Sequence, residues 1–176
     1  MKKIIFIISI TLFFVSCKKE EETVNNSETN SDQLLYEKAK ITSNFKWYNN
    51  TDSLFKRSSG SGHGQTYFKT RFNAIAANKL TSDGKVQNNT QFPEGSLIVK
   101  ELYTDQKSLD LYAILLKNSK SEDADAKGWV WGYIKPGGNV TVSASKKGSS
   151  CINCHSQAGN IDYVLMNKFY PAPLDL

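Results

Sequence analysis

The sequence predicts an α+β domain, a mostly antiparallel β-sheet with flanking helices. Three observations support this prediction. The chain has 176 residues, of which 39% are hydrophobic and 11% aromatic, as in a globular protein. A long helical pattern occurs only before the strands, at residues 31–42. Strand-like patterns separated by turn-forming residues then follow at 66–72, 95–104, 109–117 and 128–135.

Residues 1–16 predict an export signal of the lipoprotein type. Lys2 and Lys3 give a positive start, and the apolar run that ends at Val15 is shorter than the roughly 20 residues that span a bilayer. The Val-Ser pair before Cys17 resembles the lipobox of bacterial lipoproteins, which predicts that Cys17 is acylated. The alternative is an ordinary cleaved signal, which would leave Cys17 as an unpaired thiol in an oxidising compartment.

Residues 17–33 predict a flexible tether, and residues 34–176 predict a single domain. The tether has no aromatic residue and one branched aliphatic, Val24, which is too little apolar surface to fold. Lys18 and Lys19, followed by three glutamates, resemble an outer-membrane sorting signal. We therefore expect a lipoprotein anchored to a bacterial membrane, in particular the outer membrane, facing the periplasm or the cell surface. The formal charge of +5 falls to +3 without the signal, which does not favour nucleic acid as a partner.

The segments between the strands predict helices and a loop. Ser31 is a candidate N-cap, and good helix formers follow it, so we expect a helix over 31–42. Residues 49–65 are rich in Gly, Ser and Asn and predict a loop. The alanine-rich stretch 73–82 predicts a short helix or a turn.

The predicted strands differ in the pattern of their faces. Segment 66–72 alternates strictly, with an aromatic face and a cationic face that carries Lys69 and Arg71. Segment 109–117 does not alternate, which predicts burial on both faces. Segment 128–135 places three aromatic residues on one face: Trp129, Trp131 and Tyr133.

The motif CINCH, at residues 151–155, carries the clearest functional signal. Two cysteines three positions apart lie on the same side of a helical turn, so both sulfurs can reach one flat partner. This pattern is typical of c-type haem attachment, with Cys151 and Cys154 joined to the vinyl groups and His155 bound to the iron. The sequence therefore predicts one covalently attached haem c on a short C-terminal helix that ends near Gly159.

Three other interpretations of the motif stay open at this point. A thioredoxin-like redox pair would normally open a helix early in a βαβ unit, whereas this pair follows the last long strand. A disulfide between Cys151 and Cys154 would close a very small loop and stabilise little. A zinc site would have to recruit His63 or a carboxylate as its fourth ligand.

Five segments, read in order, resemble the cytochrome P-460 family, to which the β-sheet cytochromes c′ are related. They are FPEGSLIVKELY, AILLKNSK, GWVWGYI, CINCH and DYVLMNKFYP, within residues 63–173. The resemblance implies a haem packed against an antiparallel sheet, commonly in a homodimer, with an open or weakly filled distal position at the iron. It also implies binding of small nitrogen compounds, such as hydroxylamine or nitric oxide, with oxidation or detoxification. A redox partner protein is expected but is not identified by the sequence.

The resemblance implies roles for three cationic residues. In that family a lysine at the V-K-E position bonds covalently to the edge of the porphyrin, and Lys100 matches it. Alternation places Lys100 on the same face as Ile98, so this lysine is either at the surface or turned into a pocket. Hydroxylamine-oxidising members also carry a distal arginine on the early strand, where Lys69 and Arg71 are the candidates. The alternative for these two is a solvated strand face.

The sequence departs from the family where the hydroxylamine-oxidising members carry a proton-handling carboxylate. The matching segment LYAILLK has none, and Asp110 and Glu101 are nearby substitutes. Without a positioned general base, turnover of hydroxylamine should be impaired. The alternative function is therefore a gas-binding cytochrome c′-like protein or an electron carrier without turnover. In an electron carrier, His63 or Met166 could supply a second iron ligand.

Overall fold

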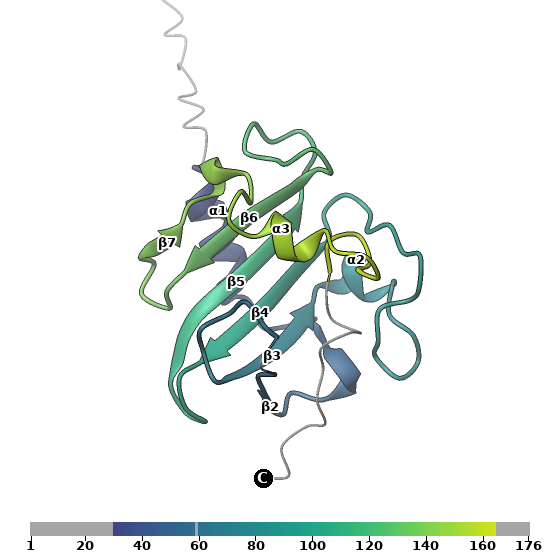
Figure 1. The fold of residues 1–176 in the computed structure, drawn as a ribbon, viewed down its shortest axis with the longest axis vertical. Helices are drawn as coiled ribbons and strands as arrows, with labels where there is room; N and C mark the ends of the chain where they lie inside the picture. The colour runs from purple at the N-terminus through teal and green to yellow at the C-terminus, as the bar shows by residue number, and fades with distance from the viewer. Residues whose placement is uncertain (1–29, 59, 165–176) are drawn as a thin grey trace, which may run out of the picture.

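The computed structural model describes residues 30–58 and 60–164, which form one seven-stranded antiparallel sheet with short helices on both faces (Figure 1). The strand order is β1-β3-β4-β5-β6-β7, and β2 also pairs with β3. The predicted fold class, α+β with a mostly antiparallel sheet, is confirmed. The strands are β1 (Lys46–Trp47), β2 (Phe55–Lys56), β3 (Tyr67–Phe72), β4 (Leu97–Tyr103), β5 (Leu109–Lys117), β6 (Trp129–Ile134) and β7 (Val140–Val142).

The four long strands, β3 to β6, lie where the sequence predicts them, within two residues at either end. They pair in chain order as a meander, which places their side chains in register across the sheet. Strands β1, β2 and β7 are not predicted, because two or three residues cannot show the alternation that identifies a strand. Strand β2 lies inside the segment 49–65 that was predicted to be a loop.

Helix α1 (Ser31–Lys40) covers the back face of the sheet in the view of Figure 1. The Asn30 side chain accepts a hydrogen bond from the backbone N–H of Asp32 and caps the helix. Leu35 is fully buried against β6, where Gly132 leaves room for it: a Cβ at Gly132 would lie 2.7 Å from Leu35 Cδ1. The helix begins at Ser31, two residues before the predicted end of the tether at residue 33, so its first turn belongs to the domain.

The predicted tether boundary at residue 33 is therefore too late. The Asp32 carboxylate accepts hydrogen bonds from the backbone N–H of Ala144, at 2.6 Å, and from the Ser143 hydroxyl, at 2.7 Å. These contacts tie the start of α1 to the short 3-10 helix Ala144–Lys146. The predicted signal at 1–16 and the predicted acylation site Cys17 lie outside the described residues.

The sheet separates two groups of buried side chains. On the back face, Leu35 and Ala39 of α1 pack against Val99, Ile114 and other aliphatic residues of the central strands. The front face carries the aromatic residues, which form two clusters. They include Tyr48, Phe72, Phe92, Trp129 and Trp131 in one cluster, and Phe55 and Phe68 in the other.

The chain after β7 crosses the front face, where helix α3 (Ile152–His155) lies over the strands (Figure 1). Helix α3 is shorter than predicted, since its last residue is His155, and the chain then turns through Gly159 at φ +87°. Helix α2 (Ala74–Ala77) occupies the start of the predicted helix or turn at 73–82. Within residues 30–58 and 60–164, no helix is long and apolar enough to cross a membrane.

Candidate functional site

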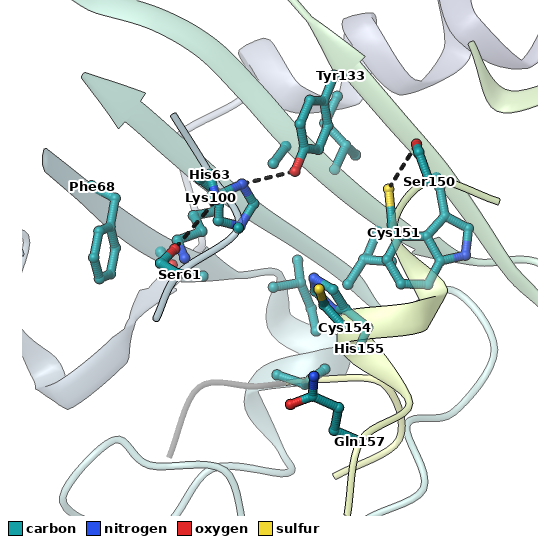
Figure 2. Close-up of a pocket in the computed structure, with 18 of the residues that line it drawn as sticks. Ser61, His63, Phe68, Lys100, Tyr133, Ser150, Cys151, Cys154, His155 and Gln157 are labelled. Atoms are coloured by element: carbon teal, nitrogen blue, oxygen red, sulfur yellow. Dashed lines mark hydrogen bonds between the residues drawn. The ribbon is translucent and has the colours of Figure 1, made fainter. Parts of the chain in front are cut away.

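A pocket lies between the front face of the sheet, the loop Gly60–His63 and helix α3 (Figure 2). Its empty space, including the open mouth, is about 1180 Å³. Apolar side chains from three neighbouring strands, Phe68, Ile98 and Leu115, form one wall. Small-molecule sites are lined mostly by apolar and aromatic side chains with a few polar groups, and this pocket has such a lining.

All three functional side chains of the CINCH motif line this pocket. Cys154 is exposed and Cys151 is half-buried, and both are free thiols rather than a disulfide. Burial raises the pKa of the Cys151 thiol. One turn of helix separates the two sulfurs, so the structure places them as the sequence predicts, on one side of α3 with His155 beside them.

The orientation of His155 is fixed by two neighbours. Its Nδ1 lies 2.6 Å from the backbone carbonyl oxygen of Tyr163, which can only accept a hydrogen bond, so Nδ1 carries the proton. The ring also packs edge-on against Trp131, with 5.1 Å between the centroids. Burial lowers the pKa of His155, which favours the neutral imidazole. In this tautomer Nε2 keeps its lone pair, as a metal-binding histidine requires.

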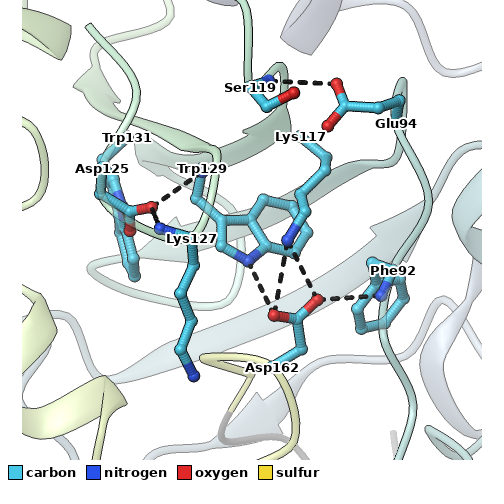
Figure 3. Close-up of polar contacts among 9 residues, drawn as sticks. All are labelled: Phe92, Glu94, Lys117, Ser119, Asp125, Lys127, Trp129, Trp131 and Asp162. Carbon is cyan, nitrogen blue, oxygen red and sulfur yellow. Dashed lines mark hydrogen bonds and ion pairs between the residues drawn. The ribbon is translucent and has the colours of Figure 1, made fainter.

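The carbonyl of Tyr163 belongs to a tight turn, Ile161–Val164, that is anchored to the sheet through Asp162 (Figure 3). The Asp162 carboxylate is buried and accepts hydrogen bonds from the backbone N–H of Phe92, at 2.9 Å, and from Trp129 Nε1, at 3.4 Å. Lys117 Nζ lies 3.3 Å from the same carboxylate. Sequence reasoning missed this role, because Asp162 meets Phe92 and Trp129 across long separations in the sequence.

Lys100 faces the pocket, on the same side of the sheet as Ile98. Its Nζ lies 4.1 Å from the centroid of the Phe68 ring, and burial lowers its pKa to about 8. A lysine in this environment is partly neutral near physiological pH, and the neutral amine is the nucleophilic form. The sequence left two positions open for Lys100, at the surface or in a pocket, and the structure places it in the pocket.

His63 and Tyr133 form a polar pair in the pocket (Figure 2). His63 Nδ1 and the Tyr133 hydroxyl are 2.7 Å apart, and the two rings stack at 5.8 Å. Burial, together with the charges of Lys100 and His155, lowers the pKa of His63, and burial raises that of Tyr133. His63 thus belongs to the site and not merely to the surface of a glycine-rich loop. The loop comes close to the CINCH motif, since a Cβ at Gly62 would lie 3.9 Å from Cys154 Sγ.

The structure contradicts the expectation that Lys69 or Arg71 faces the iron. Thr70 of β3 is paired directly with Lys100 of β4, and residues paired in this way project from the same face of a sheet. Lys69 and Arg71 therefore project from the opposite face. Arg71 is fully buried there, and it donates hydrogen bonds to Glu101 Oε1, at 2.9 Å, and to the carbonyl of Ala39 in α1.

Neither carboxylate considered as a general base lines the pocket. Glu101 is buried on the back face, between Arg71 and Lys69. Asp110 accepts a hydrogen bond from Gln65 Nε2, at 2.8 Å, and is not among the lining residues. Among the described residues that line the pocket there is no Asp or Glu. The other predicted ligand candidate, Met166, lies outside the described part of the chain.

The alternatives to haem receive no support from the described residues. Among residues 30–58 and 60–164, no group of three or more His, Cys, Asp or Glu side chains could hold a metal ion such as zinc. The strand pairs are antiparallel, so the CINCH helix does not belong to a βαβ unit of the thioredoxin type. The donor set does fit haem, because two thiols, one imidazole with a free Nε2 and a broad apolar wall share one pocket.

Comparison with known protein families gives one match. The model of the family described as Cytochrome P460 matches residues 42–166, which include the whole sheet from β1 to β7 and the CINCH motif. Comparisons with curated proteins and with solved structures give no match.

Proposed function

Because the chain belongs to the cytochrome P460 family, we propose that it is a mono-haem c-type cytochrome that binds small nitrogen compounds at its iron. In this proposal Cys151 and Cys154 attach the haem, and His155 is the protein ligand of the iron. The observation that supports it most directly is that these three side chains line one pocket with Lys100 and an apolar wall.

Different residues of the pocket would hold different parts of the haem. Cys151 and Cys154 would hold haem through two thioether bonds, because addition of each S–H across a vinyl C=C bond needs no oxidant or reductant. The His155 ring is held by Tyr163 and Trp131, which directs Nε2 away from its Nδ1 partner. Phe68, on the sheet, supplies an apolar surface. When bound, the haem supplies a redox-active iron.

Polar side chains that do not belong to the CINCH motif fit a small nitrogen compound as the ligand. Lys100 and the His63–Tyr133 pair bring hydrogen-bonding groups into an otherwise apolar cavity. Lysine can donate, and the neutral imidazole and the phenol can donate or accept. Hydroxylamine and nitric oxide are small enough to use such groups, and oxidation or detoxification of such a compound is the activity we propose. With no carboxylate in the described lining, His63 is the residue best placed to accept a proton.

A second function is favoured by that same lack of a carboxylate. A gas-binding cytochrome c′-like protein, or an electron carrier without turnover, would need no proton-accepting side chain at the iron. Steady oxidation of hydroxylamine with an added electron acceptor would exclude this second function. Tight binding of nitric oxide by the ferrous form without any turnover would instead favour it. The redox partner protein would be common to both functions.

Lys100 is also our candidate for a covalent bond to the porphyrin edge. Replacing one N–H and one C–H by a C–N bond releases two electrons and two protons, so this bond requires a two-electron oxidant such as a peroxide. The environment of Lys100 supports the proposal, since its pKa of about 8 provides a share of neutral amine. A bond of this kind would survive denaturation and would broaden and shift the ferrous absorption bands to the red.

The deciding experiment is the absorption spectrum of the full-length protein produced in a host that attaches c-type haem. Wild type is compared with Cys151→Ser/Cys154→Ser, with Lys100→Arg and with Lys69→Arg, a matched lysine on the back face. We expect wild type and both lysine variants to keep their haem in denaturant, and the double cysteine variant to hold no attached haem at all. Among the proteins that hold haem, we expect only Lys100→Arg to lose a red-shifted ferrous band. Wild-type protein without attached haem, or without any response to hydroxylamine and nitric oxide in either oxidation state, would refute the proposal.

We also propose that the protein is exported and is anchored to a membrane through acylated Cys17, facing the periplasm or the cell surface. The lipobox-like sequence before Cys17 supports this proposal. Wild type should be found in the membrane fraction and should be released by detergent, whereas Cys17→Ser should be soluble after export. Equal partition of the two proteins would contradict the lipid anchor. The homodimer that the family resemblance implies can be tested on the same samples by light scattering.

A further inference from the structure

We propose that Asp162 is a positioning residue for the iron ligand: it holds the Ile161–Val164 turn so that the Tyr163 carbonyl fixes the ring and the proton of His155. Through this contact Asp162 would tune the reduction potential of the iron. The inference rests on the proposed role of His155 as the ligand. It concerns a residue that makes no direct contact with His155 and acts through the backbone of its neighbour.

The turn has an uncommon backbone for its sequence. Ile161 and Val164 exchange two backbone hydrogen bonds, at 3.1 and 2.8 Å, and enclose Asp162 and Tyr163 at φ +46° and +67°. Positive φ at both central residues is the pattern of a type I′ turn, which normally carries Asn-Gly or Asp-Gly. Asp tolerates this conformation, but a bulky residue such as Tyr163 is an outlier in it. Such a conformation persists only where the surroundings impose it.

Asp162 is the part of the turn that the surroundings hold (Figure 3). Its side chain is fully buried, and its partners come from three separate segments of the chain. They are the backbone N–H of Phe92, before β4, the Nζ of Lys117, at the end of β5, and Nε1 of Trp129, at the start of β6. One carboxylate thus ties the turn to the ends of two adjacent strands.

The fixed turn has a direct effect on His155. With Asp162 in place, the Tyr163 carbonyl oxygen lies 2.6 Å from Nδ1. A hydrogen bond from Nδ1–H to such an acceptor fixes the tautomer and makes the imidazole a more basic ligand. A more basic ligand stabilises ferric iron relative to ferrous iron, so loosening the turn should raise the reduction potential. Tyr163 itself is further held by Lys127, whose Nζ lies 4.3 Å from its ring centroid.

The test compares two variants for which an effect of charge alone predicts opposite shifts of the potential, whereas loss of positioning predicts the same shift in both. Asp162→Asn removes a negative charge, which alone would raise the potential. Lys117→Met removes a positive charge, which alone would lower it, but it also removes the partner that holds Asp162. We measure the midpoint potential of the full-length holoprotein and the iron–histidine stretching frequency of the ferrous form. Glu101→Gln, which alters a buried carboxylate on the back face, is the matched control.

We expect both Asp162→Asn and Lys117→Met to raise the potential and to lower the stretching frequency, with Glu101→Gln unchanged. Loss of contacts behind a metal ligand typically changes metal affinity or activity 10- to 100-fold. A tenfold change in the ferrous-to-ferric ratio corresponds to about 59 mV for one electron. If either variant fails to fold, Trp129→Phe, which removes a donor to Asp162 without changing any charge, is judged by the same criteria.

Two results would overturn the inference. Opposite shifts of the potential in Asp162→Asn and Lys117→Met would show a simple effect of charge. Unchanged potential and frequency, with a lower melting temperature, would show a purely structural role. Failure of the proposed function is a different result, because it would appear in the wild type as a protein without attached haem.

Discussion

Gly148 lies three residues before Cys151, where the chain packs too closely on the sheet to accommodate a larger residue. Its φ is +69°, and a Cβ built on it would lie 2.6 Å from Nε1 of Trp131 and within 2.8 Å of two further atoms of the indole. Its carbonyl accepts the backbone N–H of Cys151, at 2.8 Å, and so begins helix α3. Gly148→Ala should therefore disturb Trp131, which packs against His155.

The expected cost has two parts. A residue with a Cβ in the left-handed region costs about 1–2 kcal/mol, and an extra methyl group in a packed site costs about 1–3 kcal/mol. Together they predict that Gly148→Ala lowers the free energy of unfolding by about 2–5 kcal/mol. Urea denaturation of the holoprotein, followed by far-ultraviolet circular dichroism, measures this change. The absorption spectrum of the same samples reports whether Trp131 has moved against the ligand.

Gly137→Ala is the control, because no atom lies within 4 Å of the added methyl group and φ is not in the left-handed region. It should change the free energy of unfolding by no more than about 0.5 kcal/mol. Adding Trp131→Phe to Gly148→Ala should recover the packing part of the cost and leave the backbone part. If Gly148→Ala is as stable as the Gly137→Ala control, neither the left-handed backbone nor the close contact with Trp131 carries the predicted cost.

Three further predictions concern charged and titratable groups. Glu101→Ala leaves Arg71 as an uncompensated buried charge and should lower the free energy of unfolding by about 3–5 kcal/mol, measured by urea denaturation. The haem spectrum should not change, and a changed spectrum would contradict the assignment of this pair to the back face. His63, whose pKa is lowered in the folded state, binds protons more readily when unfolded, so stability should fall as the pH drops below about 6.5. This slope should be shallower in His63→Gln when thermal unfolding is followed from pH 8 to 5, and identical slopes would argue against burial of the imidazole. Asp32→Ala removes two hydrogen bonds that join α1 to Ser143 and Ala144, and it should lower the free energy of unfolding by about 1–3 kcal/mol. Thermal unfolding measures this change, and an unchanged melting temperature would show that these contacts are dispensable.

The sequence predicts the long strands well because their patterns are local. Alternation in β3 and the unbroken apolar run of β5 each depend on fewer than ten neighbouring residues. The spacing of Cys151 and Cys154 is local in the same way, so their place on one side of α3 could be predicted. Strand β7 has three residues and gave no such signal.

The errors arose where a residue's role depends on pairing between distant segments. Alternation shows that Lys69 and Arg71 share a face, but only the register with β4 shows that Lys100 is on the other one. Asp162 meets Phe92 across 70 positions of sequence, a contact that no local pattern reports. His63 was correctly placed in a glycine-rich loop, but its approach to Tyr133 depends on how that loop folds over the sheet.

The two faces of the sheet are covered in different ways. Helix α1 covers the back face with its own leucine and alanine side chains, whereas on the front Phe68, Ile98 and Leu115 line the pocket. A sheet is stable when both faces are shielded from water, so a flat macrocycle lying on this wall would serve as part of the hydrophobic core. A ligand that binds only the folded chain also stabilises it. Chains without haem would then be less stable than chains that hold it, and they would be the first to unfold and to be degraded.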